Sequence, residues 1–470
     1  MNKATRTFSL MTLIIIGASL LASASDLAAK PSKPNVIYVL ADDLGYGDIG
    51  CYGQKTLLTP NLDRMTKEGM LFTRNYSGST VCAPSRCVLM TGKHTGHSRI
   101  RGNGRQLLNE DDFTVAQLFK NAGYVTANFG KWGIGHPPPP DNPNRHGFDE
   151  FFGYVNMYHA HNFYPEFLIH NGKEVKLRNE LMEIFKQKES PSIRGLGVSK
   201  EKIDYAPDII RRRMFEFIDK NHKQPFFLLY TPNTPHANNQ GGKDGLGRGM
   251  EVPDYGEFAK EEWPEEEKGF AVMIRDLDND IGNLMTLLKE YGIEKDTLLI
   301  FSSDNGPHQE GGHKMEFFDS NGDKRGLKRD LFEGGVRVPM IARWPGKIPA
   351  GKVNNSIVSF QDLMATCAEL TKSPYPETDG VSMMPALYGE KTDDISRTLY
   401  WEFPERGGKQ AILKGNWKLI RYNVRKPRME LYNVQTDPTE STNLLDQEPE
   451  RAKHLLHEML SIPDKNTIFK

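Results

Sequence analysis

Three apolar runs, each followed at once by polar residues, constrain the possible fold most strongly. They cover residues 35–41, 225–231 and 297–303. Such continuous runs are typical of strands buried on both faces of a parallel sheet. Asp42 and Asp43 follow the first run, and Asp304 and Asn305 follow the third. Since ligands of α/β folds bind beyond the carboxyl ends of the strands, we expect these four side chains to meet at one functional edge.

Helical patterns lie between the apolar runs. They cover residues 60–68, 114–122, 205–220, 265–291 and 361–370. Alternating strands and helices predict an α/β fold, with a large, mostly parallel sheet sandwiched by helices. From about Thr398 the runs become short, which predicts a small antiparallel sheet with a final helix near 448–461. We therefore expect a main domain over 25–395 and a small C-terminal α+β subdomain over 396–470.

The first 24 residues resemble a secretory signal. Lys3 and Arg6 precede an apolar run over 8–21 and the small residues Ala22 to Ala24. A membrane anchor is the alternative, but the run is short of the roughly 20 residues that span a bilayer. We expect a signal peptide over 1–24, a periplasmic or secreted mature protein, and no membrane span after signal removal.

The composition excludes two classes of protein. Lys and Arg number 60 against 61 Asp and Glu, so the chain lacks the basic excess of a nucleic-acid binder, and we expect no nucleic-acid partner. The 470 residues contain four cysteines, too few for a disulfide scaffold. A conspicuous cysteine must therefore be explained by its chemistry.

Cys82 stands in the most specific short motif, Cys82-Ala83-Pro84-Ser85-Arg86, which continues as Cys-Val-Leu-Met-Thr-Gly over 87–92. A lone cysteine is ordinarily a small buried hydrophobe. Pro84 favours a helix start, which would place Cys82 at a helix N-terminus, where backbone N–H groups attract anions. The motif thus predicts a site for a negatively charged group.

The acidic clusters suit a metal. Asp42, Asp43, Asp304 and Asn305 offer oxygen ligands, which hard cations prefer, Ca²⁺ more readily than Mg²⁺. A helix cap is the alternative for an Asp pair after a strand.

The cysteine motif closely resembles the signature at which sulfatases have a cysteine oxidised to formylglycine, and the chain resembles bacterial polysaccharide and arylsulfatase A-like members. The resemblance runs over roughly 34–445 and includes Thr59 to Asp63 and Asp379 to Ser382. It implies the alkaline-phosphatase-like fold, 3-oxoalanine at Cys82 made by a formylglycine-generating maturation enzyme, and bound Ca²⁺. The metal ligands it implies are Asp42, Asp43, Cys82, Asp304 and Asn305.

The resemblance also implies catalytic roles. The hydrated aldehyde offers two hydroxyl groups, one to attack sulfur and one whose deprotonation expels sulfate. Arg86 would orient this hydrate. Lys131 and Lys328 would neutralise sulfate oxygens, and His236 would protonate the departing alcohol.

One position departs from the family pattern. Many sulfatases carry histidine two residues after the first lysine, where this chain has Gly133. His136, three residues on, is the first candidate for the missing base and is taken as a catalytic residue; His308 or His313 could serve instead, so the base stays unresolved.

Several loops combine aromatic and polar residues, which fits a sugar-binding pocket, and packing within a loop or the core is the alternative for each. The candidate substrate contacts are Lys131, His236, Lys328, Arg101, Asn103, His159, His161, His308 and His313. Gly133 and residues 304–313 resemble a bacterial polysaccharide sulfatase subfamily associated with 4-sulfated galactose or N-acetylgalactosamine. We therefore expect a calcium-dependent, exo-acting sulfatase with a sulfated carbohydrate substrate. A phosphomonoester or phosphonate hydrolase on the same fold and an inactive sulfated-glycan-binding pseudoenzyme are the alternatives.

Overall fold

The computed structural model describes residues 33–104, 106–134, 141–187, 193–242, 246, 248–390, 392–423 and 426–469. The predicted signal peptide lies outside these residues and stays a prediction. Among the described residues, none of the helices is long and apolar enough to cross a membrane.

The central sheet has ten strands in the order β13-β2-β12-β11-β1-β10-β4-β5-β6-β7. Their bounds are β1 Asn35–Ala41, β2 Met70–Phe72, β4 Val125–Lys131, β5 Glu150–Tyr154, β6 Phe167–His170, β7 Lys173–Lys176, β10 Phe226–Thr231, β11 Thr297–Ser303, β12 Met340–Arg343 and β13 Lys352–Asn354. The five neighbours β11, β1, β10, β4 and β5 are parallel. Strands β12, β6 and β7 pair antiparallel toward the edges. The predicted mostly parallel sheet is confirmed.

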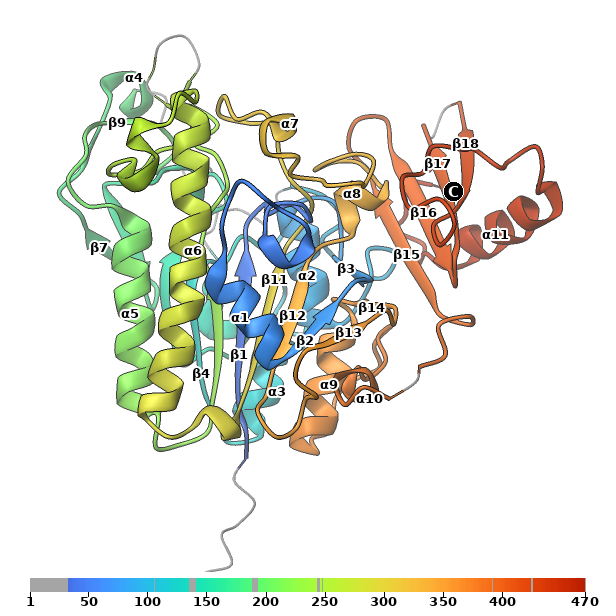
Figure 1. Cartoon of the computed structure of the whole chain (residues 1–470), viewed down its shortest axis with the longest axis horizontal. Helices are drawn as coiled ribbons and strands as arrows, with labels where there is room; N and C mark the ends of the chain where they lie inside the picture. The colour runs from blue at the N-terminus through green and yellow to red at the C-terminus, as the bar shows by residue number, and fades with distance from the viewer. Residues whose placement is uncertain are drawn as a thin grey trace, which may run out of the picture. The chain divides into compact units, whose positions relative to one another are not determined.

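Both faces of this sheet are buried beneath helices, which explains the unbroken apolar runs. In β1, Val36, Tyr38 and Leu40 face one apolar layer, whereas Ile37, Val39 and Ala41 face the other. The first layer contains α2 Cys82–Thr91, α3 Val115–Asn121, α9 Asp362–Thr371 and α10 Met384–Leu387. The second contains α1 Pro60–Glu68, α5 Ala206–Asn221 and α6 Glu265–Glu290, and α5 and α6 run together across one face in Figure 1.

Local signals place the helix ends close to their predicted positions. Helix α1 has Pro60 in its first turn and ends before Gly69. Thr114 begins α3 through a capping box, in which its side chain accepts from the Gln117 amide while the Gln117 side chain accepts from the Thr114 amide. Three glutamates occupy the first turn of α6, where the helix dipole favours negative charge.

The C-terminal part is the predicted antiparallel sheet with a helix. Strands β15 Thr398–Phe403, β16 Lys409–Lys414, β17 Trp417–Tyr422 and β18 Arg428–Asn433 follow one another in space as in sequence. One face packs on α11, Pro449–Ser461, and the other packs on residues that include Tyr76, Leu331 and Val336. Trp401 of β15 donates from Nε1 to the Ser77 carbonyl at 2.9 Å. The division at residue 395 into a domain and a subdomain stays a prediction.

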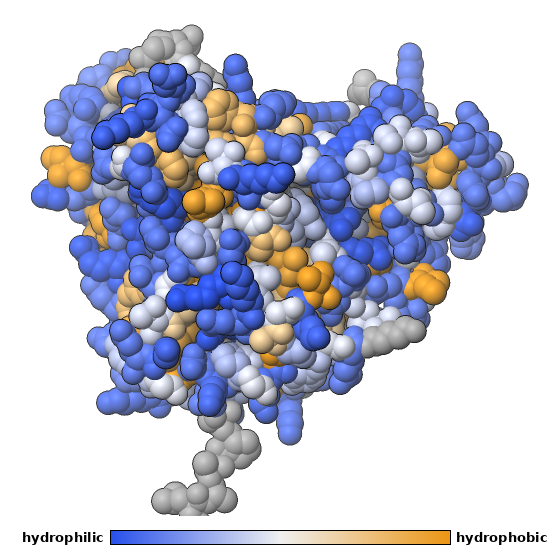
Figure 2. Space-filling model, viewed as in Figure 1, coloured by the Kyte–Doolittle hydropathy of each residue, from blue (hydrophilic) through white to orange (hydrophobic). Residues whose placement is uncertain are grey.

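Shorter elements complete the described chain. They are β3 Asn75–Tyr76 and β14 Val358–Ser359, which pair in parallel, β8 Glu180–Leu181 and β9 Ser199–Glu201, which pair antiparallel, α4 Glu183–Lys186, α7 Met315–Phe318, α8 Glu333–Val336, and 3₁₀ turns at Gly50–Tyr52, Pro143–His146, His159–His161, Gly256–Lys260 and Glu294–Asp296. Figure 2 shows that polar residues cover most of one face, with apolar residues in small groups.

Candidate active site

The carboxyl ends of β1 and β11 bring the two acidic clusters together. The strands are parallel neighbours, with Ala41 opposite Ser303. The Asp43 amide donates to Asp304 Oδ1 at 3.0 Å, and Asn305 Nδ2 donates to Asp43 Oδ1 at 2.7 Å. Asp42, like these three residues, is 0% exposed. The sequence prediction that these side chains meet at one edge agrees with this geometry.

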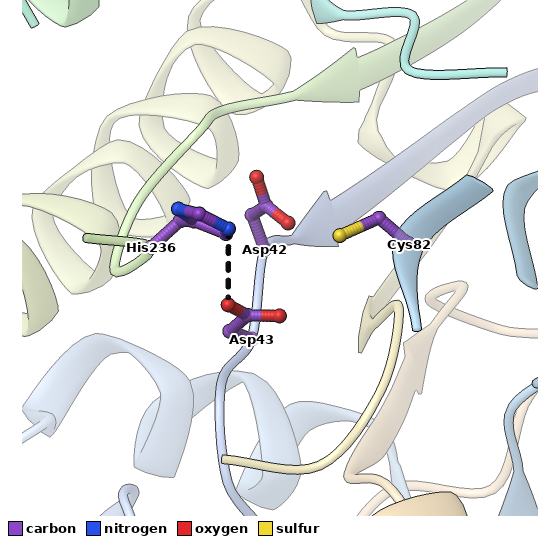
Figure 3. Close-up of side chains that lie close together, drawn as sticks. All are labelled: Asp42, Asp43, Cys82 and His236. Carbon is purple, nitrogen blue, oxygen red and sulfur yellow. Dashed lines mark ion pairs between the residues drawn. The ribbon is translucent and has the colours of Figure 1, made fainter. Parts of the chain in front are cut away.

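Cys82 is the first residue of α2 and lies opposite these carboxylates. In Figure 3, Cys82 and His236 approach Asp42 and Asp43 from opposite sides. Ligand atoms of these four residues lie within 4.8 Å of one another. Burial raises the pKa of the Cys82 thiol to about 12. An unmodified thiol here is therefore protonated and weakly nucleophilic at neutral pH.

Lys131 and Arg86 pair with two of the carboxylates. Lys131, the last residue of β4, places Nζ 2.7 Å from Asp42 Oδ2. Burial favours the neutral amine, but the Asp42 carboxylate raises the pKa of Lys131 above its ordinary value. Arg86 lies one turn along α2 from Cys82, and its Nε donates to Asp304 Oδ2 at 2.9 Å while Nη1 donates to the Lys131 carbonyl at 2.5 Å. Arg86 thereby fixes both Asp304 and the end of β4.

Lys328 and His236 approach Asp43. Lys328 Nζ lies 2.8 Å from Asp43 Oδ2 and 3.2 Å from His236 Nε2. Burial and the neighbouring Lys328 ammonium hold the pKa of His236 well below its ordinary value, so the ring is neutral. His236 Nδ1 lies 2.6 Å from the Ala237 carbonyl, which accepts only from a protonated nitrogen. The proton of the neutral ring therefore sits on Nδ1, and Nε2 accepts from Lys328.

Gly133 has a geometric reason to lack a side chain. Its φ of +63° lies in the left-handed region, which glycine adopts without steric cost. A Cβ there would lie 3.1 Å from Lys131 Cε and 3.3 Å from Arg86 Cδ. A side chain at this position would therefore crowd Lys131 and Arg86. His136, a candidate replacement base, lies outside the described residues.

Two further predicted contacts lie beside the site. The His161 ring stacks on His236 with centroids 4.5 Å apart, and its buried Nδ1 has no hydrogen-bond partner among the described residues. Asn103 Oδ1 accepts from the Ala83 amide at 3.3 Å, next to Cys82.

The structure does not support substrate contacts for three other residues. Arg101 commits its guanidinium to Ser98, Glu402 and Asp464 and lines a separate cavity of about 550 Å³. His159 packs against Tyr154 and Phe167, and burial lowers its pKa to about 3. His313 Nδ1 lies 2.6 Å from Glu267 Oε2 while its ring stacks on Phe270. Each side chain is engaged within the fold, which also argues against His313 as the missing base.

His308 is likewise unsuited to that role. Its Nδ1 accepts from the Glu310 amide at 3.0 Å, so Nε2 carries the proton and donates to the Pro235 carbonyl at 3.0 Å. Burial lowers the pKa of His308 to about 4. Both ring nitrogens are occupied, and the ring ties the Glu310 loop to the loop that carries His236.

The sequence prediction missed Glu310 and Arg329. Glu310 Oε2 lies 3.0 Å from Lys328 Nζ and 4.0 Å from His236 Nε2, and Glu310 Oε1 lies 2.6 Å from Arg329 Nη2. Burial favours protonation of Glu310, but Lys328 and then the other neighbouring positive groups hold its pKa well below the usual range. Two signals in the sequence could have identified these residues. Arg329 directly follows Lys328, and Glu310 lies between His308 and His313.

The oxygen atoms fit a bound cation. Asp42 Oδ1 and Asn305 Oδ1 are buried without a hydrogen-bond partner among the described residues. Leaving a buried acceptor unpaired costs about 1–3 kcal/mol, which a metal ligand avoids. Three carboxylates with one amide oxygen form the donor set of a hard divalent cation.

Comparisons with known proteins agree with this chemistry. The family model described as "Sulfatase" matches residues 34–373, and "N-sulphoglucosamine sulphohydrolase, C-terminal" matches residues 323–464. The N-acetylgalactosamine-6-O-sulfatase of Bacteroides thetaiotaomicron is 30% identical over 503 residues, covering 92% of this chain and 93% of that protein. The N-acetylgalactosamine-6-sulfatase of Canis lupus familiaris is 32% identical over 393 residues, covering 78% of this chain and 68% of that protein.

A solved structure extends the likeness to the fold. The crystal structure of Ps i-CgsB in complex with k-i-k-neocarrahexaose superposes with a TM-score of 0.74 at 28% identity. The match covers 91% of this chain and 92% of that chain.

Proposed function

The chain belongs to the sulfatase family and is a sulfuric ester hydrolase; on this premise, we propose that it removes 6-sulfate groups from N-acetylgalactosamine or a related sugar. Support for the sugar comes from the relatives, two of which are named for the 6-sulfate of N-acetylgalactosamine. Their names favour the 6-sulfate over the 4-sulfate that the sequence motifs suggest. The N-terminal segment supports export, so we place the mature enzyme in the periplasm or outside the cell.

The observation that carries this proposal is the buried cluster around Cys82. Three carboxylates and three cationic side chains converge where α2 begins, and Asp304 and Lys131 both contact Arg86. The three negative and three positive side-chain charges cancel. A bound divalent cation would therefore add the positive charge that a sulfate group requires.

We propose Ca²⁺ and a formylglycine at position 82 as the groups that complete the site. Asp42, Asp43, Asp304 and Asn305 would hold the cation, which supplies charge to the sulfate oxygens and lowers the pKa of a nearby hydroxyl group. An aldehyde at position 82 supplies, once hydrated, the nucleophilic hydroxyl that the protonated thiol cannot offer.

The chain's own side chains bind sulfate and move a proton. Lys131 has three N–H donors and gives one to Asp42, so it can also donate to a sulfate oxygen. Lys328 gives its three donors to Asp43, His236 and Glu310, so it would keep the Asp43 contact and turn one of the other two donors to the sulfate. His236 keeps its single proton on Nδ1, bound to the Ala237 carbonyl, so Nε2 must take a proton from Lys328 before it can deliver one to the leaving alcohol. Lys328, 3.2 Å away, is the adjacent proton donor to Nε2. Among the bases named from the sequence, His136 remains the candidate for sulfate release.

The decisive experiment compares substrates with the matured enzyme. We expect turnover of N-acetylgalactosamine 6-sulfate, weaker turnover of the 4-sulfate and little turnover of an aryl phosphate. Chelation should abolish activity, and added Ca²⁺ should restore it. Cys82→Ser should release alcohol at most once per molecule, because it lacks the second hydroxyl group.

Two outcomes would favour the alternatives. Dominant aryl phosphate turnover would indicate a phosphomonoester or phosphonate hydrolase. Stoichiometric release of alcohol without turnover by the matured wild-type protein would indicate a glycan-binding pseudoenzyme. Peptide mass measurement at residue 82 tests the modification itself, and an unmodified thiol in active enzyme would refute it.

A further inference from the structure

We propose that Glu310 and Arg329 form the subsite that recognises a hydroxyl group of the leaving sugar, next to the sulfate ester. This inference rests on the proposed function, because it assumes that His236 protonates the departing sugar oxygen. The sequence motifs assign neither residue a role, yet the fold places both at the boundary between the buried cluster and solvent.

Their position relative to His236 decides what they can reach. Glu310 Oε2 lies 4.0 Å from His236 Nε2 and 3.0 Å from Lys328 Nζ. A proton-donating Nε2 must contact the ester oxygen, so a group 4.0 Å from Nε2 is close to the carbon atoms bonded next to that oxygen. The Glu310 and Arg329 side chains are 17% and 22% exposed, whereas those of His236 and Lys328 are 1% and 2% exposed. The pair therefore lies where the sugar, rather than its sulfate, would sit.

The chemistry of the pair suits a hydroxyl group. A hydroxyl both donates and accepts, a carboxylate only accepts, and a guanidinium only donates. The ion pair of Arg329 Nη2 with Glu310 Oε1, at 2.6 Å, engages one of the three guanidinium nitrogens and fixes the two groups side by side. Directed polar groups of this kind, placed at the rim of a site, are what distinguishes one sugar hydroxyl from another.

The backbone holds both residues in place. Arg329 has a φ of +79°, a left-handed conformation that is uncommon for a long side chain and tends to occur at functional sites. Its amide donates to the Thr80 carbonyl at 2.9 Å, and its carbonyl accepts from Lys409 Nζ at 2.8 Å. Glu310 is tied through His308 to Pro235, the residue before His236. The proton donor His236 and the proposed subsite are therefore held in place by connected contacts.

The test measures kcat/KM for three kinds of substrate in wild type and Arg329→Leu. These are N-acetylgalactosamine 6-sulfate, its monodeoxy analogues and an aryl sulfate without sugar hydroxyls. We expect Arg329→Leu to lower kcat/KM for the sugar sulfate about 10- to 100-fold, because a site built around a hydroxyl group loses its donor. The aryl sulfate should change by less than about twofold, since Lys328 and His236 remain in place.

The deoxy analogues show whether the enzyme recognises a particular hydroxyl group of the sugar. Wild type should discriminate against one analogue, and Arg329→Leu should lose that discrimination because the group that reads the hydroxyl is gone. Arg329→Lys keeps the positive charge but lacks the planar guanidinium group, so its discrimination against the analogue should lie between those of wild type and Arg329→Leu. Arg329→Gly suits the positive φ and guards against a folding failure.

Arg325→Leu is the matched control. This arginine lies four residues earlier in the same segment, but its Nη1 donates to Tyr432 Oη at 3.0 Å and to the Glu440 carbonyl at 2.9 Å. We expect its substrate profile to match wild type.

Three results would overturn the proposal. An unchanged profile in Arg329→Leu would mean that the residue does not contact the sugar. Equal losses on sugar and aryl sulfates would assign Arg329 to the catalytic centre or to stability. A loss on the sugar that is the same for all deoxy analogues would point to proton transfer through His236. Failure of the proposed function is distinct, because wild type would then turn over none of the sulfate esters.

Discussion

At the residue scale, Asp304 is held by two partners, the Asp43 amide and the Arg86 guanidinium. Its Oδ1 accepts from the Asp43 amide, and its Oδ2 contacts Arg86 through Nε and Nη2, both at 2.9 Å. Burial and the nearby Asp42 carboxylate raise the pKa of Asp304 to about 7. A divalent cation would oppose this rise and keep the carboxylate charged.

Asp304→Asn should therefore abolish both turnover and stabilisation by Ca²⁺. Asparagine keeps the size of the side chain and an acceptor for the Asp43 amide but loses the negative charge. Ca²⁺ at about 100 times its Kd should stabilise wild type by about 2.7 kcal/mol, measured by thermal unfolding, and the variant by far less. Asp112→Asn, which changes a carboxylate paired with Arg99, should respond like wild type. A full response in Asp304→Asn would refute the ligand assignment.

The residues predicted to contact the sugar show what residue types alone cannot predict. Asn103 and His161 lie beside the catalytic cluster, whereas Arg101, His159 and His313 are engaged elsewhere. Histidine and arginine suit a sugar pocket and a packed, hydrogen-bonded loop equally well, so only the contacts decide between them. Glu310 escaped prediction for the complementary reason that a lone loop glutamate is ordinarily solvated.

At the scale of elements, the sequence predicts the long helices and three central strands, β1, β10 and β11, because their signals are local. Strand β4 was not predicted, because Thr126, Asn128 and Gly130 interrupt its apolar run. Strands β1 and β11 are continuous apolar runs, and α1 ends at a glycine. Strands β2, β12 and β13 were not predicted. They are three or four residues long, and strands of that length depend on their pairing partners more than on intrinsic propensity.

A buried ion cluster joins α8 to the C-terminal sheet. Lys418 of β17 lies 2.9 Å from Glu333 Oε1 and 3.1 Å from Glu440 Oε1, and all three side chains are 0% exposed. Burial raises the pKa of Glu440 to about 7 even with the lysine present. One ammonium group thus serves two buried carboxylates.

Lys418→Met should destabilise the protein by about 3–5 kcal/mol, because it leaves the buried Glu440 carboxylate without its counter-ion, while Glu333 keeps Arg337. Chemical denaturation measures this change. Lys414→Met on the neighbouring strand is the control. Lys414 pairs with Glu458, and the Lys414 side chain is 35% exposed. Its loss should cost less than about 1 kcal/mol. Similar small effects for the two variants would contradict the prediction.

At the scale of the whole molecule, a histidine fastens the end of the chain to the central part. His97 Nδ1 lies 2.8 Å from Asp379 Oδ1, and Nε2 lies 2.8 Å from the carbonyl of Ile462, just after α11. Both partners are acceptors, so a protonated ring satisfies both contacts. The spacing of His94, His97 and Asp379 would admit a metal. However, His94 Nδ1 accepts from the Gly96 amide, which places that ring's proton on Nε2 and favours a proton over a metal here.

The stabilisation by His97 should depend on pH. The hydrogen bond with Asp379 raises the pKa of His97 above its ordinary value of 6.5. A raised folded-state pKa gives stabilisation that is fully present below pH 6.5 and is lost as the pH rises through the folded-state value. The stability difference between wild type and His97→Gln should therefore be largest near pH 5.5 and shrink by pH 8.

Urea unfolding across that pH range measures the effect. Because the His97 side chain is 39% exposed, the maximum difference should stay below about 1 kcal/mol. A difference that grows toward pH 8 would contradict the assignment.

Cys82 is 1% exposed once the chain has folded. An enzyme that made the proposed formylglycine would have to reach this thiol and its neighbours, which the folded protein encloses. The Asp43 and Asp304 partners that help to bury it are 261 positions apart, so this enclosure forms only after a long stretch of chain has been made. We therefore expect a window during synthesis and export in which the thiol is reachable. If formylglycine is the nucleophile, as we propose, a chain that folds before it is oxidised would stay inactive whatever metal it later binds.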